Sequence, residues 1–411
     1  QSADTGERES QKLHYNPRSG EWDPDLSRLQ RHISIAIAHN IWEYHYSTGD
    51  DEFMNQYGVE MLMEIARFWA SIADKEEDGR YHISGVMGPD EFHEKHPNAS
   101  YEEGGFKDNA YTNIMVAWLL DRVAEEYRSM DAGARQHLTE KIRLSEAELE
   151  EWNEISRNLA IVIDKEGVIS QFDGYRALQE LDWESYRETY GNIRRMDRIL
   201  KAEGDSPDNY QVSKQADTLM IWYILSPQEV ARILELMGYE VEDPYQLLRR
   251  NYEYYVKRTS HGSTLSYIVH SAILTYLPGH EEDGWNWFIE SMRSDLYDTQ
   301  GGTTLEGIHC GVMAGSLEIM VDNFAGLQIR PDELELMPQL PKAWEGLDFT
   351  MRFRGDRYRI AISPADAEVT LSENASASQR VRVDGSSERL EPGGTVRLNY
   401  EPVERTSGQE T

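Results

Sequence analysis

The chain has 411 residues, a length that favours one large domain with a smaller second one. Asp and Glu outnumber Lys and Arg by 74 to 41, which gives a formal charge of −33. Such a charge repels nucleic-acid phosphates and anionic membranes. We therefore expect no nucleic-acid and no membrane partner.

The single cysteine, Cys310, allows no internal disulfide, and no tight Cys/His cluster indicates a structural metal site. Apolar runs such as residues 33–38 and 267–277 are shorter than the ~20 residues of a membrane span. We expect a soluble, cytoplasmic protein that binds no metal. The first ten residues carry no initiator Met and no hydrophobic region, which suggests a start inside a larger protein.

Helical periodicity dominates most of the chain. In residues 25–46 the apolar positions recur every three or four residues and predict a helix with one buried stripe, formed by Leu26, Leu29, Ile33, Ile37, Ile41 and Tyr44. A second helix over 52–73 would complete an antiparallel hairpin. Further helices are predicted over 111–127, 145–163, 214–225, 227–237, 244–259, 263–276, 284–294 and 311–324. Residues 128–144 read as a charged connection, and 164–210 as a long irregular loop of the kind that carries a site.

The pattern changes near Gln328. Short runs with strand character follow, separated by Gly and Pro at hairpin-like intervals, over 347–354, 358–363, 368–371, 379–383 and 395–400. They predict a small antiparallel β domain over 331–403, after a helical domain over 1–330 and before a frayed tail over 404–411. No fixed solenoid-type repeat is visible, so the helical hairpins are expected to close into an α/α toroid.

One loop suggests catalysis. In residues 88–93 a Gly-Pro bend precedes two carboxylates, Asp90 and Glu91, ahead of the helix that starts near Tyr111. We predict that Glu91 is a catalytic acid, because repulsion from Asp90 and cover by Phe92 would favour the protonated form that a proton donor needs. A solvated turn is the alternative for an isolated Asp-Glu pair.

Aromatic side chains are the second signal. In a toroid the loops of one rim meet at a central cleft, where aromatic faces stack on sugar rings. The candidates are Trp22, Trp183, Trp222, Trp285, Trp287, Tyr81 and Phe92. Core packing is the alternative for each of them.

Five segments carry a family resemblance. They are Gly88-Pro89-Asp90-Glu91-Phe92-His93, Asp108-Asn109-Ala110-Tyr111-Thr112-Asn113, Lys214-Gln215-Ala216-Asp217, Ser260-His261-Gly262-Ser263-Thr264-Leu265-Ser266 and Thr303-Thr304-Leu305-Glu306-Gly307-Ile308-His309. In this order they resemble glycoside hydrolase family 65, which contains inverting maltose, trehalose, kojibiose and nigerose phosphorylases and some α-glucoside hydrolases. The resemblance implies a mainly α fold, an (α/α)6 toroid followed by a small antiparallel β domain. It covers essentially the whole chain but only the last half of a family member, so the toroid is expected to be incomplete at its N-terminus.

The resemblance also implies roles for single residues. Glu91 matches the family's general acid, and Lys214 and Gln215 match residues that hydrogen-bond the glucosyl hydroxyls. Glu306 and His309 are expected to bind substrate. Phosphate needs donors and no general base, and donors are expected from the segment that contains His261, Gly262, Ser263, Thr264 and Ser266. Arg258 either adds charge there or pairs with a surface acid.

These roles imply inverting phosphorolysis of an α-glucosyl disaccharide or α-glucoside to β-glucose 1-phosphate and the free acceptor. Inorganic phosphate is the expected co-substrate, with no other cofactor, and the resemblance also implies a homodimer. Two alternatives stay open. A hydrolase of the same fold would use Glu306 as the base that activates water, and an inactive or sugar-binding fragment would use neither.

Overall fold

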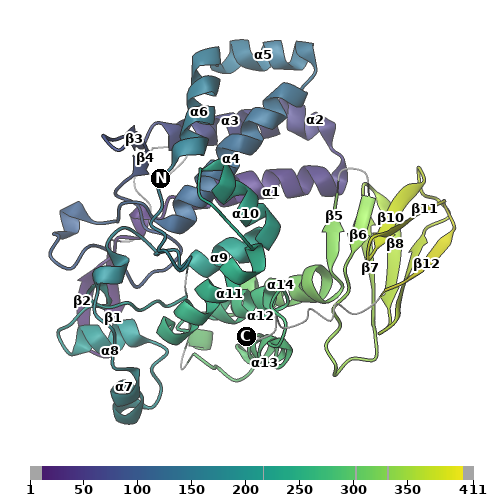
Figure 1. Ribbon diagram of the computed structural model, residues 1–411. Coiled ribbons are helices and arrows are strands. Elements are labelled where there is room, and N and C mark those ends of the chain that lie inside the picture. The colour runs from purple at the N-terminus through teal and green to yellow at the C-terminus, as the bar shows by residue number, and fades with distance from the viewer. Residues whose placement is uncertain (1–11, 216, 301–302, 331–332, 401–411) are drawn as a thin grey trace. The chain divides into compact units, whose positions relative to one another are not determined.

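The computed structural model describes residues 12–215, 217–300, 303–330 and 333–400. The chain forms two compact units, one made of the chain up to Ala38 together with Asn55–Ser266, the other of His39–Met54 together with the chain from Tyr267 (Figure 1). The predicted tail over 404–411 lies outside the described residues. No helix in the described part of the chain has the length and apolar character needed to cross a bilayer.

The first unit is mainly helical. Its helices are α1 (Ile33–Thr48, which continues into the second unit), α3 (Val59–Ala70), α4 (Ala110–Ser129), α5 (Ala132–Ile142), α6 (Glu146–Asn158), α7 (Trp183–Tyr190), α8 (Met196–Ala202), α9 (Asp217–Ile224), α10 (Pro227–Leu236) and α11 (Pro244–Tyr255). Helix α4 is central, because it packs against α3, α6, α9 and α10 and residues 110–120 are all buried. Its N-cap, Asn109, accepts a hydrogen bond from the backbone N–H of Thr112 at 2.9 Å. The start of α4 is therefore well capped.

Two short antiparallel hairpins also belong to the first unit. They are β1 (Leu13–Asn16) with β2 (Glu21–Pro24), and β3 (Ala73–Lys75) with β4 (Tyr81–Ile83). The sequence did not predict them, because strands of three or four residues give too few positions for an alternating pattern.

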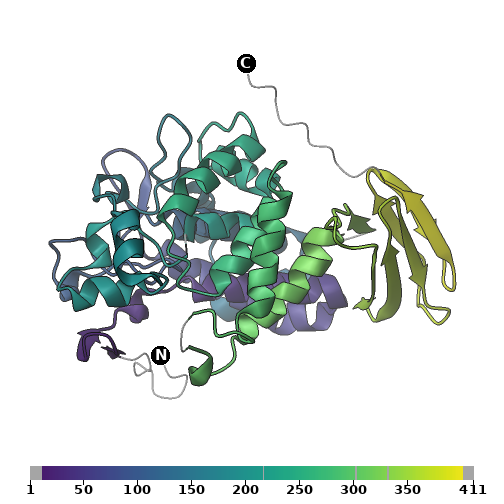
Figure 2. The same cartoon turned by 90° about the horizontal axis from the view of Figure 1, so that it is seen from below.

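The second unit combines helices with two sheets. The helices are α2 (Asp51–Phe53), α12 (Leu265–Leu274, which begins in the first unit), α13 (Glu281–Arg293) and α14 (Cys310–Glu318). The strands are β5 (Leu327–Ile329), β6 (Glu333–Leu336), β7 (Leu347–Phe353), β8 (Asp356–Ile362), β9 (Asp366–Leu371), β10 (Gln379–Val383), β11 (Ser386–Leu390) and β12 (Thr395–Asn399). They form four-stranded sheets of order β11-β10-β6-β5 and β12-β9-β8-β7, seen edge-on in Figure 2. Both sheets contribute buried side chains to one core, including Leu336, Val381, Ile360 and Val369.

The predicted fold class, a mainly α chain with a small C-terminal β domain, is confirmed. Within the β domain the pairing of β6 with β10 is parallel, whereas the other pairs are antiparallel. Strand β5 precedes residue 331, where the sequence placed the start of this domain.

The buried stripe predicted for residues 25–46 is confirmed only in part: Leu26, Leu29 and Ile41 are buried, whereas Ile33, Ile37 and Tyr44 are exposed. Helix α1 begins only at Ile33, after a 3-10 turn over Ser27–Leu29. Ile33 and Ile37 are 58% and 42% exposed, whereas Ile35 and Trp42 are buried. Because a 3-10 turn has three residues per turn, the apolar spacing before the helix does not continue in its register.

Three further predictions need correction. The charged connection over 128–144 contains α5, which is capped by Asp131, and the irregular stretch over 164–210 contains α7, capped by Asp182, and α8. The Asp caps were the clearest signal of α5 and α7. Helix α8 has no side-chain cap, and its signal was the spacing of Met196, Ile199 and Leu200. The helix predicted over 52–73 is interrupted by a π-helical segment, Met54–Gly58.

Candidate active site

The loop at residues 88–93, called the acid loop below, is anchored through Asp90, which is 2% exposed. Its Oδ1 accepts a hydrogen bond from the backbone N–H of Lys214 at 2.9 Å, and its Oδ2 accepts one from Gln171 Nε2 at 2.8 Å. His93 Nδ1 lies 3.1 Å from the same Oδ2. Asp90 therefore ties the acid loop to two segments that are distant in the sequence.

The predicted acid and the predicted sugar-binding residues meet at this loop. Lys214 Nζ donates to Glu91 Oε2 at 2.7 Å, and Gln215 Nε2 donates to the carbonyl of Pro89 at 2.9 Å. About 120 residues separate the two segments in the chain, yet three contacts join them. The structure thus brings together residues that the sequence assigned to one site.

The predicted surroundings of Glu91 are wrong in two respects. Its side chain is 54% exposed, and Phe92 packs instead into an apolar cluster with Leu181 and Met196. Asp90 is engaged by its donors and is not a bare charge beside Glu91. Alternating residues of a tight loop point in different directions, so neighbours in the sequence do not share an environment.

The predicted phosphate segment, residues 260–266, runs beside residues 213–215, called the Lys214 segment below. The N–H of Ser260 donates to the carbonyl of Ser213 at 2.8 Å, and the N–H of Gly262 donates to the carbonyl of Lys214 at 3.1 Å. Acid loop, Lys214 segment and phosphate segment are therefore connected in one chain of contacts.

Backbone geometry inside this segment is demanding. His261 has a φ of 53°, a left-handed conformation that is uncommon for a residue with a side chain. A Cβ at Gly262 would lie 2.2 Å from the carbonyl oxygen of Arg194, so only glycine fits there. Strained residues of this kind gather at ligand sites, where the surrounding structure holds them in place.

The polar side chains of the segment differ in exposure. His261 Nδ1 lies 2.8 Å from Ser266 Oγ, and Ser263 Oγ accepts from the N–H of Leu265 at 3.3 Å. Ser266 and Thr264 are 0% and 3% exposed. Thr264 and Ser266 are therefore buried at the start of α12, while His261 and Ser263 are more accessible.

Two histidines of the site were missed by the sequence reasoning. Burial opposes the charged form of His93, but Asp90, Asp208 and the Tyr210 carbonyl outweigh it and raise the pKa of His93. Burial lowers the pKa of His32 to about 4, which leaves this imidazole neutral within range of the Glu91 charge. His93 is part of the motif at residues 88–93, so the sequence could have indicated it. His32 lies outside every motif, so nothing in the sequence pointed to it.

Two roles were expected for Arg258, adding charge to the phosphate segment or pairing with a surface acid, and the structure shows the second. Its guanidinium contacts Glu180, with Nη2 2.6 Å from Oε1, and lies 3.8 Å from the ring centre of Tyr254. Arg258 is therefore paired with an exposed acid.

Glu306 and His309 belong to the second unit. Glu306 ends the short helix Thr303–Glu306, and its side chain lies outside what the structure describes. His309 Nδ1 lies 2.6 Å from Asp295 Oδ1, and its backbone N–H donates to Asp295 Oδ2 at 2.7 Å. Burial would raise the pKa of Asp295, but the contacts from His309 outweigh it and lower it. Substrate binding by both residues stays a prediction.

The aromatic candidates divide by exposure. Trp222, Phe92 and Tyr81 are 1%, 3% and 8% exposed, which fits core packing. Trp22 is 64% exposed and lies 5.3 Å, centre to centre, from the ring of Tyr15.

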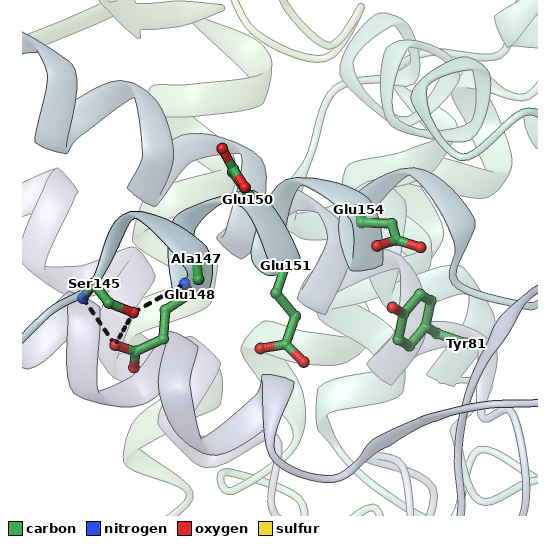
Figure 3. Close-up of a pocket in the computed structure, with 7 residues that line it drawn as sticks. All are labelled: Tyr81, Ser145, Ala147, Glu148, Glu150, Glu151 and Glu154. Atoms are coloured by element: carbon green, nitrogen blue, oxygen red, sulfur yellow. Dashed lines mark hydrogen bonds between the residues drawn. The ribbon is translucent and has the colours of Figure 1, made fainter.

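A shallow hollow of about 470 Å³ lies on α6 and is lined mainly by glutamates (Figure 3). Of the predicted residues, the aromatic candidate Tyr81 lines it, but none of the predicted catalytic, sugar-binding or phosphate-binding residues does. Glu148 is held by the cap residue Ser145 and by Arg67, and Glu154 pairs with Lys75. Such a surface is a solvated helix face and offers no convergent donors for a sugar.

Family models match both the helical part of the chain and its β domain. The profile of the "Glycosyl hydrolase family 65 central catalytic domain" matches residues 1–318, and that of the "Glycosyl hydrolase family 65, C-terminal domain" matches residues 327–390. The three motifs joined above lie within the first match.

Individual relatives are similar over most of this chain. An uncharacterised glycosyl hydrolase of Mycobacterium tuberculosis is 43% identical over 97% of this chain and 30% of its own length. The trehalose 6-phosphate phosphorylase of Lactococcus lactis is 42% identical over 90% of this chain and 46% of its own length. A solved structure of a candidate kojibiose phosphorylase from the human microbiome superimposes with a TM-score of 0.70 at 25% identity, covering 89% of this chain and 46% of that one. The chain thus spans less than half the length of these relatives.

Proposed function

Because the chain belongs to glycosyl hydrolase family 65, we propose that it carries the catalytic centre of an inverting α-glucoside phosphorylase. The observation that carries this proposal is the meeting of Glu91, Lys214 and the His261 segment in one network of contacts. A proton donor, a sugar-hydroxyl donor and an anion-binding segment are the parts that phosphorolysis requires.

The proposed reaction has one displacement step. Glu91 gives its proton to the glycosidic oxygen, the bond from this oxygen to C1 breaks, and a phosphate oxygen forms the new bond to C1 from the opposite face. The products are β-glucose 1-phosphate and the acceptor with a free hydroxyl. Phosphate is an anion at neutral pH, so no general base is needed, and the reaction uses no metal and no organic cofactor.

Lys214 is assigned two successive contacts. Its ammonium group rests on Glu91 at 2.7 Å. A glucosyl hydroxyl that accepts from Lys214 would draw the ammonium away and leave the acid to face the glycosidic oxygen. Gln215, whose Oε1 is buried without a hydrogen-bond partner in the described structure, has acceptor capacity for a second hydroxyl.

The anion site is assigned to His261 and Ser263 with the N–H groups at the start of α12. A helix N-terminus of this kind attracts an anion through its unsatisfied N–H groups and its dipole. His261 would add a donor to a bound phosphate.

The donor sugar is proposed to be an α-glucoside, and the relatives indicate which to test first. One acts, by its name, on trehalose 6-phosphate, and another bears the name of a kojibiose phosphorylase. We propose α,α-trehalose 6-phosphate as the first substrate to test.

The test is the release of β-glucose 1-phosphate by the longest natural form of the protein. The donors are trehalose 6-phosphate, trehalose, kojibiose, maltose and nigerose, each with and without inorganic phosphate. We expect product from at least one donor, and only with phosphate. Sugar release that ignores phosphate would contradict phosphorolysis and favour the hydrolase, with Glu306 tested next as the base.

A further inference from the structure

Asp217 lies directly behind the acid loop. It is the first residue of α9, which packs against α4 and α11 (Figure 1), and it is 0% exposed. Its Oδ2 accepts from Asn109 Nδ2 at 2.9 Å. The same oxygen lies only 1.9 Å from where a Cβ at Gly88 would stand. The carboxyl group therefore touches the backbone of the residue that opens the acid loop.

The neighbouring carboxyl, Asp90, takes most of the donors in this cluster. Lys214 N–H, Gln171 Nε2 and His93 Nδ1 all point at its oxygens. The other ring nitrogen of His93 lies 2.9 Å from the carbonyl of Tyr210. Both nitrogens thus face acceptors, which requires an imidazolium. The charges of Asp90 and His93 therefore cancel. Both ring N–H groups of His93 donate to other acceptors and not to Asp217.

Asp217 has few hydrogen-bond donors among the described residues: the side chain of Asn109 and the backbone N–H of Thr218. Its Oδ1 is buried and has no hydrogen-bond partner among the described residues. The titratable groups that face it are Asp90 and His93 from the acid loop, Tyr111 from α4 and Tyr255 from α11. Burial raises the pKa of both tyrosines, so they are neutral at physiological pH. Burial, and then the charge of Asp90, raise the pKa of Asp217 to about 8, against opposing effects of Asn109 and His93.

We propose that Asp217 is a positioning residue that supports the acid loop as an uncharged carboxylic acid. In the neutral form it contacts Gly88 without repelling Asp90. Loss of its proton would place a second negative charge in a buried cluster that holds one imidazolium, and burying an unpaired carboxylate is strongly unfavourable. The acid loop would then shift and move Glu91 away from Lys214.

The proton can be observed directly, whatever the protein's activity. A protonated carboxyl has an infrared carbonyl band that a carboxylate lacks. We expect this band in the wild-type protein at slightly acidic to neutral pH and its partial loss in Asp217→Asn. The control is Asp322→Asn in the second unit: Asp322 is an exposed residue, but desolvation of its carboxyl, followed by the charges of Glu318 and Glu43, raises its pKa to about 7. It should lose a band of the same kind.

Activity separates positioning from a plain packing role, and this part rests on the proposed phosphorolysis. Asp217→Asn keeps the shape and the acceptor for Asn109, so kcat at neutral pH should stay close to that of the wild type. Asp217→Ala removes the support, and kcat should fall about 10- to 100-fold, since small misplacements of a catalytic group cost that much. The Asp322→Asn control should leave kcat unchanged.

The outcomes separate cleanly. An unchanged infrared band in Asp217→Asn would overturn the proposal, and so would a folded Asp217→Asn protein that has lost activity as fully as Asp217→Ala. If Asp217→Ala does not fold, the infrared difference and the Asn variant still decide. If no donor sugar is phosphorolysed at all, the proposed function fails while the infrared result stands on its own.

Discussion

Two carboxylate-rich regions of the first unit differ sharply. Around the acid loop, Asp90 and Asp217 are 2% and 0% exposed and contact segments from distant parts of the chain. On α6, neighbouring glutamates line an open hollow (Figure 3). Two of them, Glu148 and Glu154, pair with the cations Arg67 and Lys75. A hollow and a high density of acids are therefore poor guides to a site. Convergence of distant segments on buried polar groups is the better one, because only such groups are held in fixed positions.

The largest difference between the two regions should appear in catalysis. Glu91→Gln removes the proposed proton donor and should lower kcat/KM for phosphorolysis about 10²- to 10⁴-fold, the usual contribution of general acid catalysis. Glu151→Gln, in the α6 hollow, is the matched control and should leave the rate unchanged. The measurement is β-glucose 1-phosphate release. Normal phosphorolysis by Glu91→Gln would contradict the role of Glu91 as the proton donor.

The second largest effect should be on stability. Asp90→Asn leaves the buried His93 imidazolium without its counter-ion, and breaking a buried pair costs about 3–5 kcal/mol. Glu154→Gln breaks the exposed pair with Lys75 and should cause no measurable change. Urea unfolding of both variants gives the two values. Equal stabilities would show that burial does not distinguish these carboxylates.

A smaller effect is expected at the phosphate segment. His261→Ala removes one charge-assisted hydrogen bond worth about 1.5–3 kcal/mol, which corresponds to about a 10- to 100-fold higher KM for phosphate. The KM for the sugar should change less. His137→Ala, on the exposed side of α5, serves as the control. A raised sugar KM with an unchanged phosphate KM would move His261 to the sugar site.

A further prediction concerns the dependence of stability on pH. The folded protein holds the Asp217 proton up to a pKa of about 8, whereas the unfolded chain releases it near the ordinary Asp value of 3.8. Between these values the folded state binds more protons, so stability falls as pH rises. His93, with its raised pKa, acts in the same direction, since its contribution is lost as pH rises through the folded value. Thermal unfolding of Asp217→Asn should therefore decline less steeply with pH than that of the wild type. Parallel curves would contradict a retained proton.

Local sequence was a good guide where a pattern repeats. The helices α4, α6 and α10 and most strands of the β domain were predicted, because their apolar spacing and turn residues recur over several positions. Short strands and polar helices such as α5 were missed for lack of such repetition. The motifs of the proposed site were found as segments, with Glu91, Lys214 and His261 among them.

The sequence by itself determined the fold class, the family resemblance and the residue types of the proposed site. Only the tertiary structure decided the environments. In the structure the side chain of Glu91 is exposed and pairs with Lys214, and Asp90 accepts a hydrogen bond from the N–H of Lys214. The carboxyl group of Asp217 lies against Gly88. The physical reason is the distance along the chain over which each effect acts. Periodicity and capping involve a few neighbouring residues. The protonation and orientation of a side chain depend on groups that lie about a hundred residues away in the chain.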